Sequence, residues 1–203
     1  MRFLPAGPSA VLVEVDSPDE VFSLTAEIDR RRREGWRDTL VDVVPGATTV
    51  LLDGVAGPDG LAAEMATWSL PPVDASNVVT VEIECRYDGP DLADVAGFWG
   101  VPEAQVADIH TSLPHRVAFS GFSPGFAYLD GLGEHWQVPR RPAPRTAVPA
   151  GSVGLGGNYT GIYPRSSPGG WQIIGHTDAP LWDPDRDPPA LLVPGTSVRF
   201  VAT

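Results

Sequence analysis

The sequence contains no lysine, and all 14 of its basic residues are arginine. Schiff-base catalysis and a phosphate-loop lysine both need a lysine amine, so this chain can support neither. Its single cysteine, Cys85, can neither form an internal disulfide nor hold a metal as a thiolate cluster. No apolar run approaches the ~18 residues that span a bilayer, and residues 1–15 lack the pattern of a secretory signal. We therefore expect a cytoplasmic protein without a membrane role.

Positive charge is also scarce. The 203 residues carry 14 basic and 26 acidic side chains, which gives a net charge of -12 and a pI near 4.6. This balance opposes binding to nucleic acid or to anionic lipid. Apolar residues make up 42% and charged residues 20%, as in folded globular proteins. The length predicts one or two domains.

The first part of the chain alternates between strand and helix patterns. A β-branched apolar run at 10–15 predicts a strand, and Ser17 and Glu20 form a capping box that begins a helix ending at Gly35. A hairpin follows over 40–52. Further predictions are a helix over 61–68 and a strand over 79–85. The order β-α-β-β-α-β is ferredoxin-like, so we expect an α+β chain that begins with a ferredoxin-like domain over 1–88.

The second part is richer in turn residues. Residues 1–113 hold 9 prolines and 9 glycines, whereas the shorter segment 114–203 holds 13 of each. Asp91 is expected to cap a helix that ends at Gly100, and Pro102 to begin another. Short β-like pieces then alternate with dense turns, which is typical of a barrel or sandwich. We therefore expect a second, β-rich domain over 89–203.

Neither a serine nucleophile nor a metal site is supported by the residues that could suggest it. Residues 121–125 match the Gly-x-Ser-x-Gly nucleophile elbow, in which the residue after the serine donates its N–H to an oxyanion. That residue is Pro124, which has no N–H, so a serine nucleophile at Ser123 is disfavoured. The four histidines lack metal-ligand spacing, and we expect no bound metal.

Three features keep both a functional and a structural interpretation. The proline-arginine run 138–145 holds guanidinium groups on a stiff backbone, and it fits an anion site and a surface loop about equally well. His110 is a candidate general base, although capping a helix end is the favoured role. The glycines of 151–157 offer loop amides to a ligand, but barrel turns are favoured.

A set of ordered motifs closely resembles one family. The motifs are Gly121-Phe122-Ser123-Pro124-Gly125-Phe126-Ala127-Tyr128-Leu129, Pro139-Arg140, Pro144-Arg145, Val148-Pro149-Ala150-Gly151-Ser152-Val153, Tyr163-Pro164 and Ser167-Pro168-Gly169-Gly170-Trp171. The family is that of the B subunit of 5-oxoprolinase, also labelled allophanate hydrolase subunit 1 and including the Kip-type inhibitors of a sporulation kinase. The resemblance implies a small α/β domain followed by a cyclophilin-like β-barrel.

The resemblance also implies an activity and partners. With a related C subunit plus an unrelated A subunit, such a chain cleaves 5-oxoproline to glutamate, using ATP at the level of the complex and no cofactor bound to this chain. The alternatives are part of a carboxyltransferase that acts on allophanate or carboxybiotin, and a histidine-kinase inhibitor. The resemblance also implies roles for individual residues. These are His110 as acid or base, Arg140 and Arg145 as anion contacts, Tyr163 as a donor that lines the pocket, and the loop amides of Gly125, Gly151 and Ser152.

Overall fold

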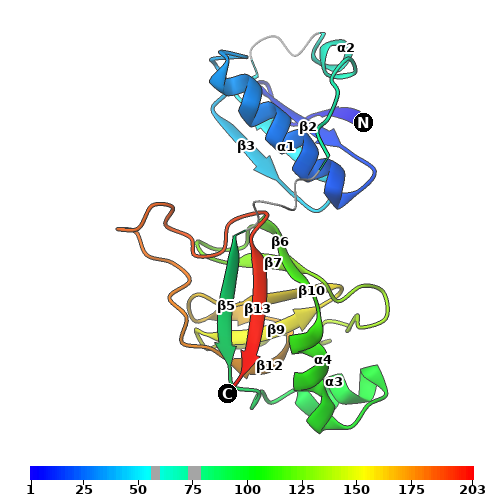
Figure 1. Ribbon diagram of the computed structural model, residues 1–203, viewed down its shortest axis with the longest axis vertical. Helices are drawn as coiled ribbons and strands as arrows, with labels where there is room; N and C mark the ends of the chain where they lie inside the picture. Colours follow the sequence, from blue (N-terminus) through cyan, green and yellow to red (C-terminus); the bar gives the residue numbers. More distant parts are fainter. Residues whose placement is uncertain (56–59, 73–78) are drawn as a thin grey trace. The chain divides into compact units, whose positions relative to one another are not determined.

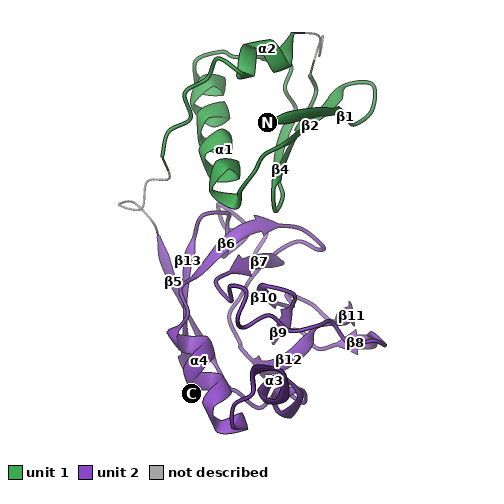
Figure 2. Ribbon diagram, turned by 90° about the vertical axis from the view of Figure 1, so that its right-hand side faces the viewer, with its two compact units in different colours: residues 1–77 green, residues 78–203 purple. Residues whose placement is uncertain are grey.

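The structure, a computed structural model, describes residues 1–55, 60–72 and 79–203. The chain divides into two compact units, residues 1–77 and residues 78–203, each with its own hydrophobic core (Figure 1 and Figure 2). Over the described ranges, no helix has both the length and the apolar character needed to cross a membrane.

Unit 1 is a four-stranded antiparallel sheet covered by helices. Its strands are β1 (Arg2–Pro5), β2 (Ala10–Glu14), β3 (Asp42–Pro45) and β4 (Thr49–Asp53), in the order β1-β2-β4-β3. Val13 and Val50 pair across the sheet and are fully buried. Leu24 and Ile28 of helix α1 (Pro18–Arg33) belong to the same core, as does Met65 of the short helix α2 (Leu61–Met65). The alternation of buried and exposed positions therefore sets the inner face of the sheet.

Helix α1 begins as the capping box predicts. The Ser17 hydroxyl accepts a hydrogen bond from the Glu20 N–H at 3.2 Å, and Pro18 occupies the first turn. At the other end, the last turn of α1 carries four consecutive arginines, Arg30 to Arg33. Arg30 and Arg31 both form ion pairs with Glu27, whose side chain is only 6% exposed. The run therefore anchors a buried carboxylate of its own helix.

The sixth element of the predicted ferredoxin-like order does not belong to unit 1. Strand β5 (Thr80–Cys85) lies in unit 2, where it pairs in parallel with β13 (Ser197–Ala202). The sheet of unit 1 takes its fourth strand from β1, a segment without a strand pattern of its own. The predicted ferredoxin-like domain over 1–88 is therefore wrong in its last strand, β5, which belongs to unit 2. An alternating pattern identifies a strand, whereas its partner is chosen by contacts more than a hundred residues away in sequence.

Unit 2 is a nearly closed barrel. Its seven-stranded sheet has the order β12-β9-β10-β7-β6-β13-β5. The remaining strands are β6 (His115–Ser120), β7 (Ala127–Asp130), β9 (Ser152–Gly156), β10 (Tyr159–Ile162) and β12 (Gln172–His176). A bridge between Arg86, just after β5, and His176 of β12 brings the two ends of the sheet together. Strands β8 (Arg145–Val148) and β11 (Ser167–Gly169) form a separate two-stranded sheet (Figure 2).

Three helical elements lie together in unit 2 (Figure 1). They are α3 (Leu92–Trp99), the 3-10 turn η1 (Glu103–Gln105) and α4 (Val106–Ser112). Gly100 ends α3 in the left-handed conformation, as predicted from its position. The chain enters this region through Gly89, whose N–H donates to the Ile174 carbonyl of β12. This contact continues the closure of the barrel up to the start of α3.

Gly89→Ala and Gly97→Ala should have opposite effects on stability. A Cβ at Gly89 would lie 2.3 Å from the Ile173 carbonyl oxygen, whereas a Cβ at Gly97 within α3 meets nothing within 4 Å. We expect Gly89→Ala to lower the free energy of unfolding by at least about 2 kcal/mol. Gly97→Ala should raise it by up to about 1 kcal/mol, because alanine favours a helix. Denaturant unfolding measures both, and equal effects would contradict the close approach at Gly89.

Candidate functional site

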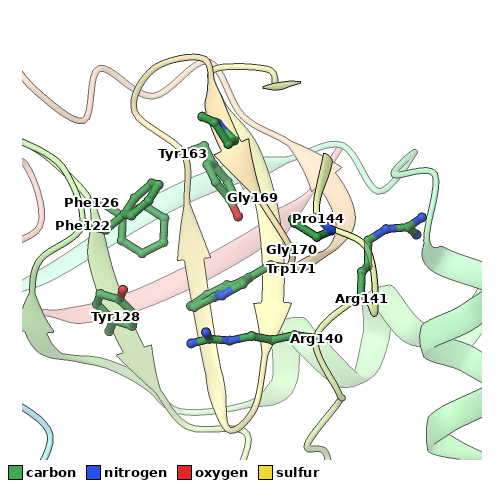
Figure 3. A pocket seen from close by; sticks show the side chains of 11 residues that line it. Phe122, Phe126, Tyr128, Arg140, Arg141, Pro144, Tyr163, Gly169, Gly170 and Trp171 are labelled. Carbon is green, nitrogen blue, oxygen red and sulfur yellow. The ribbon is translucent and has the colours of Figure 1, made fainter. Parts of the chain in front are cut away.

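A pocket of about 320 Å³ opens in unit 2 (Figure 3). Its lining consists of Phe122, Phe126, Tyr128, Arg140, Arg141, Pro144, Tyr163, Pro168, Gly169, Gly170 and Trp171. Phe126, Tyr163 and Trp171 also belong to a small buried cluster that is separate from the main core of the barrel. The pocket therefore combines a rigid aromatic wall with two arginine side chains.

The aromatic wall is built from strand ends. Phe126 lies just before β7, Tyr163 just after β10 and Trp171 just before β12. The Phe126 ring packs edge-on against Tyr163 and Trp171, with centroids 5.4 Å and 5.6 Å away. A Cβ on Gly161 would lie 2.8 Å from Phe126 Cζ and 2.9 Å from Trp171 Cζ3. The rings can pack this closely because the strand between them has a glycine there.

Arg140 is the cation that the structure presents to the pocket. Two hydrogen bonds fix the backbone on either side of it: Gln172 Nε2 donates to the Pro139 carbonyl at 3.1 Å, and the Arg141 N–H donates to the Gly170 carbonyl at 2.7 Å. The Arg140 side chain extends in the same direction as the Trp171 indole, whereas the Arg141 guanidinium points away (Figure 3). No carboxylate in the described part of the chain forms an ion pair with Arg140.

Asp91 holds the segment that carries the arginines. Its side chain is 2% exposed, and its Oδ1 accepts hydrogen bonds from Arg141 Nη1 and Arg145 Nη2, both at 2.8 Å. Its Oδ2 accepts from the Ile173 N–H at 2.6 Å, and its own N–H donates to the Ile173 carbonyl at 3.0 Å. The predicted cap of α3 makes no side-chain capping bond to the helix. Asp91 instead joins the start of α3, strand β12 and the arginine segment.

We call the contacts of Asp91 with Arg141 and Arg145 the clamp. Around it, hydrogen-bond donors outnumber hydrogen-bond acceptors. One carboxylate faces two guanidinium groups, and Arg141 Nε and Arg145 Nη1 are buried with no hydrogen-bond partner among the described residues. Burial raises the pKa of the Tyr163 phenol, which therefore keeps its proton at neutral pH. The Arg140 guanidinium, which has no ion-pair partner among the described residues, and the apolar wall beside it favour a small anion with an apolar body.

His110 does not reach the pocket. It is completely buried in α4, where its Nδ1 is 2.7 Å from the Tyr87 hydroxyl and its Nε2 is 3.0 Å from Thr160 Oγ1. Burial holds its pKa well below the usual value, so the ring is neutral. The structure thus places His110 outside the pocket lining, with a hydrogen-bonding group at each ring nitrogen, and its role as acid or base stays a prediction.

The three loop positions also lie away from the pocket lining. The Gly151 N–H donates to the Tyr163 carbonyl, and the Ser152 N–H donates to the Pro149 carbonyl, so both amides are used within the barrel. Gly125 forms a tight turn, where an added Cβ would lie 2.9 Å from Trp182 Cβ. Among the predicted site residues, Arg140 and Tyr163 therefore both line the pocket, whereas Arg145 is bound to Asp91 and is not part of the lining.

Sequence reasoning missed most of the aromatic wall. Phe126 and Tyr128 enter it only as part of a motif, although their spacing of two places both side chains on one face where β7 begins. Trp171 has the pattern of a core residue, and it is both buried and part of the lining. Arg141 has no role of its own in the proline-arginine run. The period-two spacing is the signal that the sequence offers for the wall.

Comparisons with known proteins show the family of this chain. Residues 1–192 match the family model described as carboxyltransferase domain, subdomain C and D. The B subunit of 5-oxoprolinase from Escherichia coli O157:H7 is 41% identical over 96% of this chain and 93% of its own length. That of Haemophilus influenzae is 37% identical over 99% of this chain and 97% of its own length. This chain belongs to the 5-oxoprolinase B-subunit family.

Solved structures share the fold of this member of the 5-oxoprolinase B-subunit family. TTHA0988 superposes with a TM-score of 0.78 and 33% identity over 96% of this chain, which spans 40% of that protein's length. The Kluyveromyces lactis urea amidolyase superposes with a TM-score of 0.74 at 20% identity over 99% of this chain and 15% of its own length, which shows a common fold alone. The two-unit architecture thus also occurs within longer chains.

Removing the Asp91 charge should destabilise unit 2 far more than removing an exposed carboxylate. Asp91→Asn leaves two guanidinium groups without their buried counter-charge, and we expect a loss of about 3 kcal/mol in the free energy of unfolding. Asp88→Asn is the matched control, since Asp88 pairs with Arg86 on the surface, and it should cost less than about 1 kcal/mol. Denaturant unfolding of the two variants tests the clamp, and similar losses would contradict it.

Mild acid should destabilise the protein through two buried histidines. The rings of His110 and His115 lie 4.5 Å apart, and burial lowers the pKa of both in the folded state. Above about pH 6.5 both histidines are neutral in the folded chain and in the unfolded chain. Below that pH the unfolded chain binds protons at these histidines, whereas the folded chain does not. The free energy of unfolding should therefore fall by up to about 1.4 kcal/mol per pH unit for each histidine.

Thermal unfolding between about pH 7.5 and about pH 5.5 measures this decline, because carboxylates in the unfolded chain titrate lower. His110→Gln should reduce the slope, whereas the control His135→Gln, at an exposed position, should keep it. An unfolding temperature that stays constant across this pH range would contradict the prediction that His110 and His115 are buried in the neutral form.

Proposed function

We propose that this chain is the B subunit of an ATP-dependent 5-oxoprolinase complex, which opens 5-oxoproline to glutamate together with the A and C subunits. Two relatives named as the B subunit of 5-oxoprolinase align along more than nine-tenths of their own lengths. The word subunit in their names implies further chains. In this proposal ATP acts at the level of the complex, and this chain is inactive without its partners.

The observation that carries the proposal is an arginine without an ion-pair partner, within the described residues, beside an aromatic wall. 5-Oxoproline is a small five-membered lactam with one carboxylate. The Arg140 guanidinium fits that carboxylate, and the Phe126 and Trp171 rings fit the apolar edge of the lactam. The phenol of Tyr163, which also lines the pocket, supplies a further polar group. Arg145 supports this site through Asp91, which also holds Arg141.

The proposed reaction explains why an anion site is needed. A lactam amide is inert, and transfer of the γ-phosphoryl group of ATP to the carbonyl oxygen makes its carbon electrophilic. Attack by one water on that carbon breaks the ring C–N bond and leaves an acyl phosphate. A second water then hydrolyses the acyl phosphate, so the products are glutamate, phosphate and ADP. Arginines that hold the carboxylate orient the substrate, and the aromatic wall limits access of water before phosphorylation. Our proposal gives this chain these binding and orienting roles.

Carboxyl transfer is a second candidate function. It is favoured by the description of the matching family model, which names a carboxyltransferase domain. A carboxylated intermediate would present its carboxylate to the same arginine. The two functions differ in their product, because only 5-oxoprolinase activity releases glutamate from 5-oxoproline.

Glutamate release from 5-oxoproline and ATP tests the proposal, with candidate A and C subunits from the same genome. We expect product only when this chain is present. Arg140→Gln should lower kcat/KM by about 30- to 100-fold, mostly through a higher KM, because it removes a charged hydrogen bond to the substrate. Arg33→Gln changes an exposed arginine at the end of α1 and should leave the activity unchanged.

Two results would contradict the proposal. If the folded, assembled complex releases no glutamate, then the substrate assignment is wrong, and carboxyl transfer or kinase inhibition becomes the better explanation. If Arg140→Gln and Arg33→Gln are equally active, then the complex acts on 5-oxoproline without using this pocket.

A further inference from the structure

Phe122 has a conformation that neither its backbone preference nor its burial explains. Its φ is +64°, in the left-handed region, which bulky side chains rarely adopt because it is sterically costly. Its side chain is nevertheless 59% exposed, so little burial offsets that cost. Strained residues of this kind persist where the surrounding structure imposes them, and they concentrate at binding sites.

The turn around Phe122 imposes this conformation. The Ser123 N–H donates to the Gly121 carbonyl at 2.7 Å, and the Phe126 N–H donates to the Ser123 carbonyl at 2.9 Å. The Gly121 N–H in turn donates to the Phe126 carbonyl at 3.2 Å. Gly125 packs so closely against Trp182 that a side chain there would collide with it. Three hydrogen bonds and one tight contact therefore hold the turn that carries the ring.

The ring stands at the open side of the aromatic wall. Phe122 lines the pocket, and its centroid lies 5.2 Å from that of Phe126 and 6.2 Å from that of Tyr163, edge-on in both cases (Figure 3). The neighbouring rings are almost fully buried, whereas more than half of the Phe122 surface is exposed. A ligand in the pocket would contact the wall and cover part of this exposed ring.

We propose that Phe122 is a specificity-determining residue that covers the ring of a cyclic carboxylate whose anionic group is held by Arg140. The inference rests on the proposed function for the location of the ligand, and it adds the ligand class: small carboxylates with a compact, largely apolar ring. Arg140 binds any small carboxylate, and Phe122 separates cyclic from acyclic ones. An aromatic face that becomes covered only when a ring is bound gives this discrimination.

The test compares two probes, 5-oxoproline and acetate, by calorimetry on the full chain and on its complex with the C subunit. Phe122→Gly should weaken 5-oxoproline binding about tenfold and change acetate binding less than about twofold. Phe122→Tyr keeps the ring and should bind both probes like the wild type. Phe98→Ala is the control, since Phe98 is 51% exposed on α3 and is not part of the pocket lining.

Thermal unfolding separates a binding role from a structural one. Glycine adopts a positive φ without strain, so Phe122→Gly should leave the unfolding temperature unchanged or raise it while binding of the cyclic probe falls. A lower unfolding temperature with unchanged binding would overturn the proposal. So would equal weakening of both probes, or a defect confined to assembly with the C subunit, which would make the ring a partner contact.

A third probe, cyclopentanecarboxylate, distinguishes this inference from the proposed function. If it binds in a manner that depends on Phe122 while 5-oxoproline does not bind, then the inference stands and the oxoprolinase assignment fails. If glutamate is released normally but Phe122→Gly leaves KM unchanged, then the function stands and the inference fails. If neither the chain nor its complex binds any cyclic carboxylate, the inference is refuted.

Discussion

The carboxylate of Asp91 is the contact on which the candidate site depends. It is nearly inaccessible to solvent, yet it accepts hydrogen bonds from two guanidinium groups that lie 50 and 54 residues further along the chain. A buried carboxylate without a partner is strongly destabilising, so Asp91 depends on the two arginines that pair with it. Asp91 is bonded to the Ile173 backbone in both directions. The clamp thus fixes the arginine segment to the strand that ends the barrel sheet.

Arg140 gains its position from this clamp without taking part in it. The residue after it, Arg141, is held by Asp91, and the residue before it, Pro139, is held by Gln172. Arg140 lies between two fixed points and directs its charge toward the aromatic wall (Figure 3). The three arginines therefore have two roles. Arg141 and Arg145 pair with Asp91 inside the protein, while Arg140 has no ion-pair partner within the described residues. A pre-oriented cation binds an anion with little loss of entropy.

Local patterns predict the local structure, and they are less informative about contacts between distant segments. The capping box of α1, the hairpin and the glycine that ends α3 each depend on neighbouring residues, and each is present. An aspartate just before a helix normally caps it, but Asp91 is recruited by arginines that no short window contains. The partner of β5 escapes prediction for the same reason. The proline-arginine run suggests an anion site but does not single out Arg140, and Tyr163 becomes a candidate only through a family motif, which carries long-range information in a short sequence.

The parallel pairing of β5 with β13 also determines when unit 2 can fold during synthesis. These are its first and last strands in chain order, and six residue pairs join them along their full length. A ribosome must therefore complete β13 before β5 has its neighbour, whereas the four strands that the structure describes in unit 1 are complete by Asp53. Unit 1 can fold on the nascent chain, while β5 waits with an unpaired edge for more than a hundred residues. Translation speed and chaperone access over that interval should matter for the barrel and not for the first unit.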